Sequence, residues 1–379
     1  MLGRHNHSPK RVRFAVVGLG FIAQTAVLPA FTHAGRSAEL AALISSDPVK
    51  LHELGQRYNV PHLYAQTDYD AALAADTFDA VYIALPNSLH CDFALRAAIA
   101  GKHILCENPL ALTSWECTEM IRVCQEHHVR LMAGYRLHFE RGNMRAAAIV
   151  RSGEIGAPRI VEGVFSMQVS AENARLHKEY FGGLMYDIGI FGINAARYLF
   201  RAEPRRVTAL SSTPPDPRFS ETPGLTTAIL DFDGGRLAAI TASYGSTPTS
   251  YFNVIGTAGT LRLSPAFDFS APLHLELKTP ERVEREYFPV GDQFAPEILE
   301  FARCILEHDE PESSGLEGLA DVRIIEAIER ASASGRVIEL PDFKKPRRPD
   351  LAQTSHIAPA KDTPPLVHVH SPHRQSTEG

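Results

Sequence analysis

The stretch RFAVVGLGFIAQ, residues 13–24, constrains the fold of this chain more than any other. A short apolar run is followed by Gly18-Leu19-Gly20 and then by a helix-like segment. This order predicts a buried strand, a tight turn and a helix whose first N–H groups face the turn, where they can hold an anion. Ala23 provides the small residue that the motif needs where helix meets strand. The backbone predicted to hold the pyrophosphate of a dinucleotide is that of Gly18, Gly20, Phe21, Ile22 and Ala23.

Strand-like and helix-like segments alternate over residues 11–133. The predicted strands are Val12–Val17, Ala38–Ser45, Ala80–Leu85, His103–Cys106 and Arg130–Ala133. The predicted helices are Phe21–Phe31, Pro48–Tyr58, Tyr69–Ala75, Leu89–Ala100 and Ser114–His127. Nearly continuous apolar strands are typical of a parallel sheet covered on both faces. Residues 11–133 are therefore predicted to form an α/β Rossmann domain with a doubly wound parallel sheet.

Alternating apolar and polar residues dominate the following part of the chain, after a predicted helix over residues 143–151. The segments are Arg159–Val169, Arg206–Ser211, Thr226–Phe232, Arg236–Ser243, Phe252–Ile255, Thr260–Leu263 and Leu273–Leu277. This periodicity, with tight turns such as Asp233-Gly234-Gly235, predicts an α+β domain over residues 134–340 with a large, open, mainly antiparallel sheet. Because an open sheet of this size usually covers itself with another copy, we expect a homodimer or homotetramer.

The two ends of the chain differ from its middle. Residues 1–10 are expected to form a flexible tail, and a late helix is predicted to begin at a capping box, Ser314 to Glu317, and to end near Gly335. Residues 341–379 hold seven of the 26 prolines and few large apolar residues, so we expect a disordered tail. Its histidines could bind a metal, but a solvated tail without metal is the favoured interpretation; they are His368, His370 and His373.

Charge and composition exclude several functions. The net charge of −6 is spread along the chain in both signs, which argues against a nucleic-acid partner. The sequence contains no run of 18 apolar residues that could span a membrane, and its N-terminus lacks the apolar core of a secretion signal. Five cysteines without metal-type spacing favour a reduced, cytoplasmic location.

The end of the predicted strand 38–45 decides the choice of cofactor. An NAD enzyme places an acidic residue there to bind the ribose 2′-hydroxyl, but Glu39 lies at the opposite end. Ser45, Ser46 and Lys50 suit a 2′-phosphate, so NADP is the favoured cofactor. NAD remains possible, because Asp47 could bind a free ribose and the other three could be ordinary turn and surface residues.

Two further loops follow predicted strands at the same edge of the sheet. The first contains Leu85, Pro86, Asn87 and His90, and we assign all four to the cofactor site. Asn87 can hydrogen-bond the ribose or the carboxamide, whereas a lone histidine such as His90 is more often structural. The second loop, Cys106-Glu107-Asn108-Pro109, places Glu107 and Asn108 beside the expected nicotinamide.

Together, these motifs resemble the glucose-fructose oxidoreductase / inositol dehydrogenase family (Gfo/Idh/MocA), and most of all its glucose-fructose oxidoreductase-like branch. The resemblance covers residues 11–340 and includes two further stretches, Gly134–Glu140 and Gly182–Gly189. It implies a dinucleotide-binding domain joined to a substrate domain with an open sheet, and an activity on sugars or polyols.

The resemblance also implies two functional side chains that this sequence replaces. Asn108 stands where the family has the lysine of Glu-Lys-Pro, and Phe191 stands where it has the His or Tyr that moves a proton. Neither replacement can titrate. Asp187 then becomes the first choice as base, although it could instead cap a helix. Arg136 is expected to contact cofactor or substrate, or else to pair with Glu140 on one helix face.

Other residues are weaker candidates for the pocket: His138, His177, Lys178 and Tyr180 as helpers of the base, and Tyr135 and Asn194 as lining. The sequence thus supports two hypotheses. One is an NADP-dependent oxidoreductase that acts on a sugar or polyol through an altered site. The other is a nucleotide-binding, non-catalytic protein with a sensing role, since losing a positioned acid or base costs roughly 10²–10⁴-fold in rate.

Overall fold

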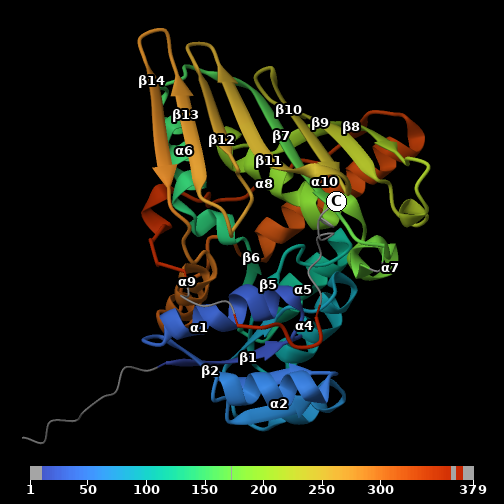
Figure 1. Cartoon of the computed structure of the whole chain (residues 1–379), viewed down its shortest axis with the longest axis vertical. Coiled ribbons are helices and arrows are strands. Elements are labelled where there is room, and N and C mark those ends of the chain that lie inside the picture. Colours follow the sequence, from blue (N-terminus) through green and yellow to red (C-terminus); the bar gives the residue numbers. More distant parts are fainter. Residues whose placement is uncertain (1–10, 172, 360–363, 370–379) are drawn as a thin grey trace, which may run out of the picture.

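The structure, a computed structural model, describes residues 11–171, 173–359 and 364–369. Two domains, each built on one sheet, are stacked along the long axis of the molecule (Figure 1). The N-terminal sheet lies in the lower half of this view, and the large second sheet rises above it. Both predicted fold classes are confirmed.

The first sheet has six parallel strands in the order β3-β2-β1-β4-β5-β6. Their bounds are β1 Val12–Val17, β2 Ala38–Ser45, β3 His62–Ala65, β4 Ala80–Ile83, β5 His103–Glu107 and β6 Leu131–Gly134. The strand order reverses between β1 and β4, which opens a ligand-binding crevice beyond the carboxyl ends of these strands. Strand β3, which alternates half-buried and exposed residues at the sheet edge, was missed in the sequence because it lacks an apolar run.

Helices cover both faces of this sheet. They are α1 Leu28–Ala34, α2 Pro48–Arg57, α3 Tyr69–Ala74, α4 His90–Ile99 and α5 Ser114–Glu126. The helix predicted over residues 21–31 is instead irregular, with a π-helical turn over Ala23–Val27 (η1) before α1. Pro29 has no N–H to donate to the carbonyl four residues before it, which accounts for the change of register.

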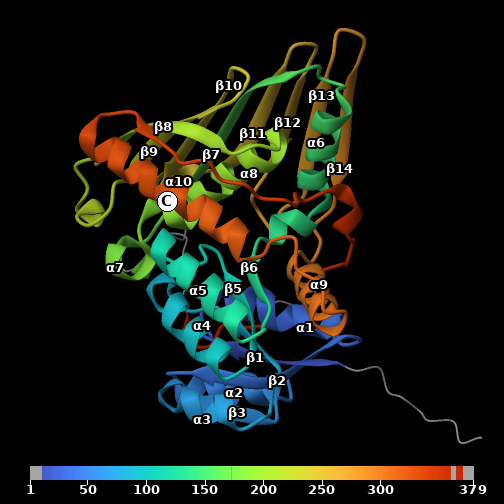
Figure 2. The same ribbon diagram turned by 180° about the vertical axis from the view of Figure 1, so that it is seen from behind.

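The second sheet has nine strands in the order β14-β13-β12-β11-β7-β10-β9-β8-β15. It is antiparallel apart from the β7–β10 pair. The strands are β7 Pro158–Gln168, β8 Pro204–Ser212, β9 Leu225–Phe232, β10 Arg236–Ser243, β11 Gly245–Gly256, β12 Thr260–Ser264, β13 Leu273–Lys278, β14 Val283–Phe288 and β15 Ile338–Glu339. Helices α6 Arg141–Ser152, α8 Ile190–Phe200 and α10 Gly315–Ser334 cover one face (Figure 2).

The other face of this sheet carries an exposed apolar row. Leu237, Ile160 and Ile255 lie side by side on three neighbouring strands, and all three are exposed. The remaining short helices are η2 Gln66–Asp68, η3 Asn87–Leu89, η4 Arg136–Phe139, η5 Ala174–Leu176, α7 Lys178–Phe181, η6 Met185–Gly189, η7 Pro217–Phe219 and η8 Leu351–Gln353.

Two late helices pack against the first domain. Helix α9, Phe294–Leu306, lies beside α1, and its Phe301 ring is 6.2 Å from that of Phe14 in β1. Helix α10 lies against both α5 and β8. It begins after Ser314 and ends at Gly335 as predicted, but the expected capping box is wrong because the Ser314 side chain makes no cap bond. The carboxylate of Glu317 is held by buried cations instead.

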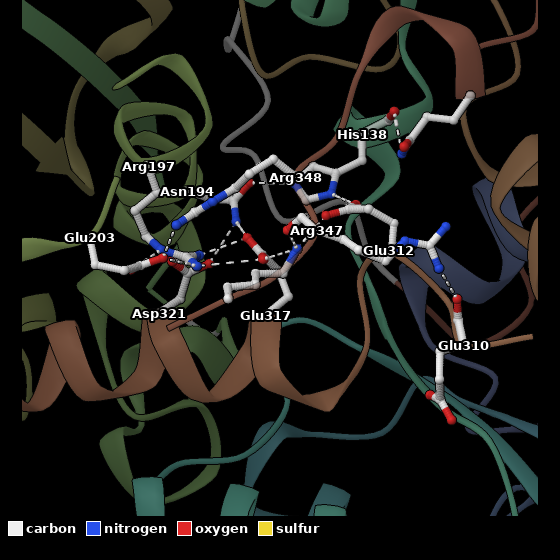
Figure 3. Close-up of polar contacts among 12 residues, drawn as sticks. His138, Asn194, Arg197, Glu203, Glu310, Glu312, Glu317, Asp321, Arg347 and Arg348 are labelled. Atoms are coloured by element: carbon white, nitrogen blue, oxygen red, sulfur yellow. Dashed lines mark hydrogen bonds and ion pairs between the residues drawn. The ribbon is translucent and has the colours of Figure 1, made fainter. Parts of the chain in front are cut away.

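The C-terminal segment departs from the expected disordered tail. Residues 341–359 and 364–369 lie against the folded protein, and Figure 3 shows part of the contact. The Lys345 ammonium is buried and lies 2.8 Å from Glu317 Oε2. Arg348 Nη2 lies 2.6 Å from Glu203 Oε1. Composition predicts disorder where apolar burial is small, but these two cations are held by buried carboxylates of the second domain.

Membrane spans and metal ligands can be assessed only for the described residues. Over the described residues, no helix is long and apolar enough to cross a membrane. The same residues contain no group of three His, Cys, Asp or Glu side chains arranged to hold a metal. His370 and His373 lie outside the described residues. All five cysteines are buried free thiols.

Candidate active site

The glycine turn after β1 has the shape that a dinucleotide requires. Gly18 has φ +93°, and a Cβ there would lie 2.5 Å from the Ala84 carbonyl oxygen, so only glycine fits. A Cβ on Gly20 would meet nothing within 4 Å, so space is open above its backbone. The Gln24 N–H donates to the Gly20 carbonyl at 3.1 Å, which begins the helix and leaves the preceding N–H groups without helical partners. These residues therefore fit a bound pyrophosphate.

The loop after β2 separates the predicted 2′-phosphate ligands. Ser45 is buried, and its Oγ accepts the Asp47 N–H at 3.1 Å, so it shapes the turn. Asp47 Oδ1 caps helix α2 by accepting the N–H groups of Val49 and Lys50 at 2.9 and 3.2 Å. Ser46 is exposed. Within the described part of the chain, no hydrogen bond or ion pair engages the Lys50 ammonium, which leaves it available to an anion.

The loop after β4 joins the two domains. Leu85 lies against Gly18, and the Asn87 Nδ2 donates to the Phe181 carbonyl at 2.9 Å. The assignment of His90 to cofactor contact is wrong. Its ring is fully buried, and its nitrogens lie 2.9 Å from the carbonyls of Leu85 and Pro109. Burial lowers the His90 pKa, and the ring links the loop after β4 to the loop after β5.

Asn108 follows β5 at the carboxyl edge of the sheet. Its Nδ2 donates to the Gly134 carbonyl, at the end of β6, at 2.6 Å. This bond fixes the side-chain amide and leaves Oδ1 and a second N–H for a ligand. Glu107, expected beside the cofactor, points beneath the edge instead. Its Oε1 accepts the Tyr82 hydroxyl at 2.8 Å.

A second carboxyl group below this edge was missed in the sequence. Glu297, on α9, is buried, and its Oε2 lies 3.5 Å from the Tyr82 hydroxyl. Its Oε1 has no hydrogen-bond partner among the described residues. Burial and the neighbouring Glu107 carboxylate raise the Glu297 pKa well above its usual range. The Tyr82 hydroxyl therefore lies between the two carboxyl groups, and the raised pKa favours the protonated form of Glu297.

Arg136 connects the two domains. Its guanidinium is buried, donates to the Phe267 carbonyl at 2.7 Å and is hydrogen-bonded to the Gln293 amide oxygen. The alternative pairing with Glu140 is wrong, because Glu140 caps α6 by accepting the N–H groups of Gly142 and Asn143. The Phe191 ring lies 5.2 Å from the Arg136 guanidinium carbon. Phe191 thus reaches the carboxyl edge of the first sheet from the second domain.

Asp187 lies one helical turn before Phe191, inside η6 rather than at a helix cap. Arg175 Nε lies 3.0 Å from its Oδ2, and the Tyr244 hydroxyl donates to the same oxygen at 2.8 Å. Neither partner was expected, because Tyr244 directly follows a strand of the second sheet and only the folded topology brings it here. Two donors therefore fix the orientation of the Asp187 carboxylate.

The weaker candidates lie elsewhere. His177 pairs with Glu221 and Lys178 with Glu329, while Tyr180 is exposed. Tyr135, His138 and Asn194 belong to a buried network against α10.

That network surrounds Arg197 (Figure 3). The Arg197 guanidinium contacts three carboxylates at 2.7 to 2.8 Å, those of Glu203, Glu317 and Asp321. His138 Nδ1 lies 2.8 Å from Glu312, and its Nε2 lies 2.8 Å from the Asn194 amide oxygen. Since both acceptors are oxygens, the ring carries two N–H donors. The network is structural: it holds α8, α10 and the C-terminal segment together.

Comparison with known proteins identifies relatives across both domains. The sequence profile described as an oxidoreductase family with an NAD-binding Rossmann fold matches residues 12–135. The profile described as the GFO/IDH/MocA C-terminal domain matches residues 143–262. A D-xylose 1-dehydrogenase [NADP(+)] of Haloarcula marismortui is 33% identical over 337 residues, which cover 87% of this chain and 93% of that protein.

Solved structures give the same picture. The aldose-aldose oxidoreductase of Caulobacter crescentus, complexed with glycerol, has a TM-score of 0.83 at 35% identity. The match covers 87% of this chain and 100% of that one. KijD10, a 3-ketoreductase from Actinomadura kijaniata in complex with NADP and TDP-benzene, has a TM-score of 0.78 at 25% identity and covers 85% of this chain and 98% of its own.

Proposed function

This chain belongs to the Gfo/Idh/MocA family of oxidoreductases, and on that premise we propose that it oxidises a hydroxyl-bearing carbon of a sugar or polyol with NADP⁺. The arrangement that supports the proposal lies at the carboxyl edge of the first sheet, where the open glycine turn and the Asn108 amide are found. Phe191, one helical turn after Asp187 in the second domain, packs against Arg136, which follows β6 at this edge.

Two observations favour NADP. The Lys50 ammonium stands free one turn into the helix that follows β2, and the xylose dehydrogenase relative is named for NADP(+). Ser46, exposed in the same loop, offers a hydroxyl. A 2′-phosphate bound here gains a cation and a hydrogen-bond partner that a free ribose does not need.

The residues of this chain divide the reaction among them. A bound NADP⁺ would supply the hydride acceptor for the substrate carbon. Asp187 accepts the proton of the substrate hydroxyl, so one C–H and one O–H bond break as the carbonyl forms. Arg175 and Tyr244 fix the orientation of the carboxylate, because the Arg175 Nε donates to Oδ1 at 3.1 Å and the Tyr244 hydroxyl donates to Oδ2 at 2.8 Å. A positioned base of this kind contributes roughly 10²–10⁴-fold to the rate.

Asn108 and Phe191 serve as positioning residues. The free N–H and carbonyl oxygen of the Asn108 amide can hold the reacting hydroxyl in place of the absent ammonium group. Phe191 packs against Arg136, whose buried charge favours a developing alkoxide electrostatically. The exposed apolar row Leu237–Ile160–Ile255 suits a second copy of the chain, so we also propose a homo-oligomer.

The proposal is tested by mixing the purified protein with NADP⁺ and a panel of aldoses and polyols while the absorbance of reduced nicotinamide is followed. Turnover of at least one sugar with NADP⁺ supports it. Tight NADP⁺ binding without turnover of any member would instead favour the sensing role.

A further inference from the structure

The C-terminal residues 364–369 lie against the glycine turn of the first domain. The Gln24 side-chain amide donates to the Leu19 carbonyl at 2.9 Å and to the Val367 carbonyl at 3.0 Å. In return, the Val367 N–H donates to Gln24 Oε1 at 2.8 Å. The Val367 side chain is 5% exposed and belongs to the apolar core around β1 and α1. One buried side chain therefore ties this segment to the phosphate-binding turn.

The next residue reaches the end of β2. His368 Nδ1 lies 3.1 Å from Asp47 Oδ2. On the other side, Arg57 Nη1 donates to the Pro365 carbonyl at 3.0 Å. The segment thus runs from helix α2 to the glycine turn and crosses the edge where a Rossmann domain receives the adenosine ribose.

Charge at this edge presents a conflict for a phosphorylated cofactor. Asp47 sits where an acidic side chain favours a free ribose 2′-hydroxyl and repels a phosphate. Lys50 contacts Asp47 only through its backbone N–H among the described residues. Contact between His368 and Asp47 places an N–H donor, and a cation when the ring is protonated, against the carboxylate. The second ring nitrogen has no partner among the described residues, and in the protonated ring it carries an N–H that can donate to a phosphate oxygen.

We propose that residues 364–369 form one wall of the cofactor site and that His368 is a specificity-determining residue, which offsets Asp47 and so favours a 2′-phosphorylated dinucleotide. This inference rests on the proposed cofactor site. None of the described atoms of the segment comes within 4 Å of the position that a Gly20 Cβ would take. It borders the turn and leaves the space above Gly20 open.

The test compares the affinities of the full chain for NADP⁺ and NAD⁺ by calorimetry, without substrate. His368→Ala is expected to weaken NADP⁺ binding roughly tenfold, the loss expected for one charged hydrogen-bond donor, while NAD⁺ affinity changes by less than about twofold. His127→Ala, at an exposed helix end far along the sequence, is the matched control and should change neither. A chain truncated after Pro359 keeps the Lys345 and Arg348 contacts and should lose at least as much NADP⁺ affinity as His368→Ala.

Three results would overturn the inference. If His368→Ala binds NADP⁺ as tightly as the parent does, His368 does not determine cofactor specificity. Tighter binding of both cofactors by the truncated chain would make the segment an inhibitor rather than a wall. Failure of the parent to bind either dinucleotide would overturn the proposed function together with this inference, whereas the first two results leave the proposed function standing.

Discussion

The centre of the Phe191 ring lies 5.2 Å from the guanidinium carbon of Arg136. Phe191 comes from α8 of the second domain, whereas Arg136 follows β6 of the first. The position at which the family resemblance implies a proton-moving His or Tyr is therefore used to pack a buried cation across the domain interface. The proposed base, Asp187, lies one turn earlier, in η6.

Asp187→Asn keeps the size of the side chain but removes its ability to accept a proton. We expect kcat to fall roughly 10²–10⁴-fold with NADP⁺ affinity unchanged. Steady-state kinetics and cofactor titration on the same samples check this. Asp233→Asn, which removes an exposed pair with Arg205, is the control and should keep full activity. An Asp187→Asn variant as fast as the parent would exclude Asp187 as the base.

Gly20→Val places a side chain in the open space above the glycine turn. Since nothing lies within 4 Å of that Cβ, the fold should tolerate it, but the pyrophosphate loses its site. We expect an unchanged melting temperature and NADP⁺ binding weakened at least 100-fold, measured by calorimetry. Gly35→Val, also in open space, should leave both properties unchanged. Normal cofactor binding by Gly20→Val would place the dinucleotide elsewhere.

Lys345→Met tests whether the C-terminal segment is part of the fold. It leaves the buried carboxylates of Glu312 and Glu317 without one of their cations, a change that costs about 3–5 kcal/mol when an ion pair is buried. The midpoint of urea unfolding should fall accordingly. Lys344→Met, at the exposed neighbouring position, should have little effect. Equal midpoints for the two variants would show that the segment adds nothing to stability.

His138 makes stability depend on pH. Burial by itself lowers the His138 pKa, but the Glu312 and Glu317 carboxylates outweigh burial and raise it. A raised folded-state pKa adds stability that is complete below the unfolded value, about 6.5, and is lost as pH rises through the folded value. The melting-temperature advantage of the parent over His138→Gln should therefore shrink as pH rises above about 6.5. If the advantage of the parent grows with pH instead, folding lowers the His138 pKa and the account of this residue is wrong.

Periodicity predicted most strands of both sheets, because the burial of each follows the apolar pattern of its own residues, but β3, β14 and β15 were missed. The positions of Asn108 and the glycine turn followed from the rule that ligands lie beyond the carboxyl ends of parallel strands. The Glu107 side chain is instead held by the Tyr82 hydroxyl, and the His90 ring lies against two backbone carbonyls, contacts that no local pattern of the sequence reveals.

Contacts between residues far apart in the chain could not be predicted from the sequence. Arg175 and Tyr244 meet Asp187 only after the second sheet has folded, and no local pattern connects them. Lys345 and Arg348 read as solvated charges in a proline-rich stretch, because the acids that hold them lie on other elements. Nothing in the local sequence distinguishes Glu297 from a solvent-exposed charge on an amphipathic helix. Its burial follows only from the packing of α9 against the first domain.

The most direct test of the account compares turnover of the parent with that of the Asn108→Lys/Phe191→Tyr double variant, on the same sugar and at saturating NADP⁺. The altered site is proposed to be catalytic as it stands, so the parent should turn over and the double variant should be no more than about tenfold faster. An inert parent that binds NADP⁺, beside a double variant that gains activity by orders of magnitude, would contradict the account.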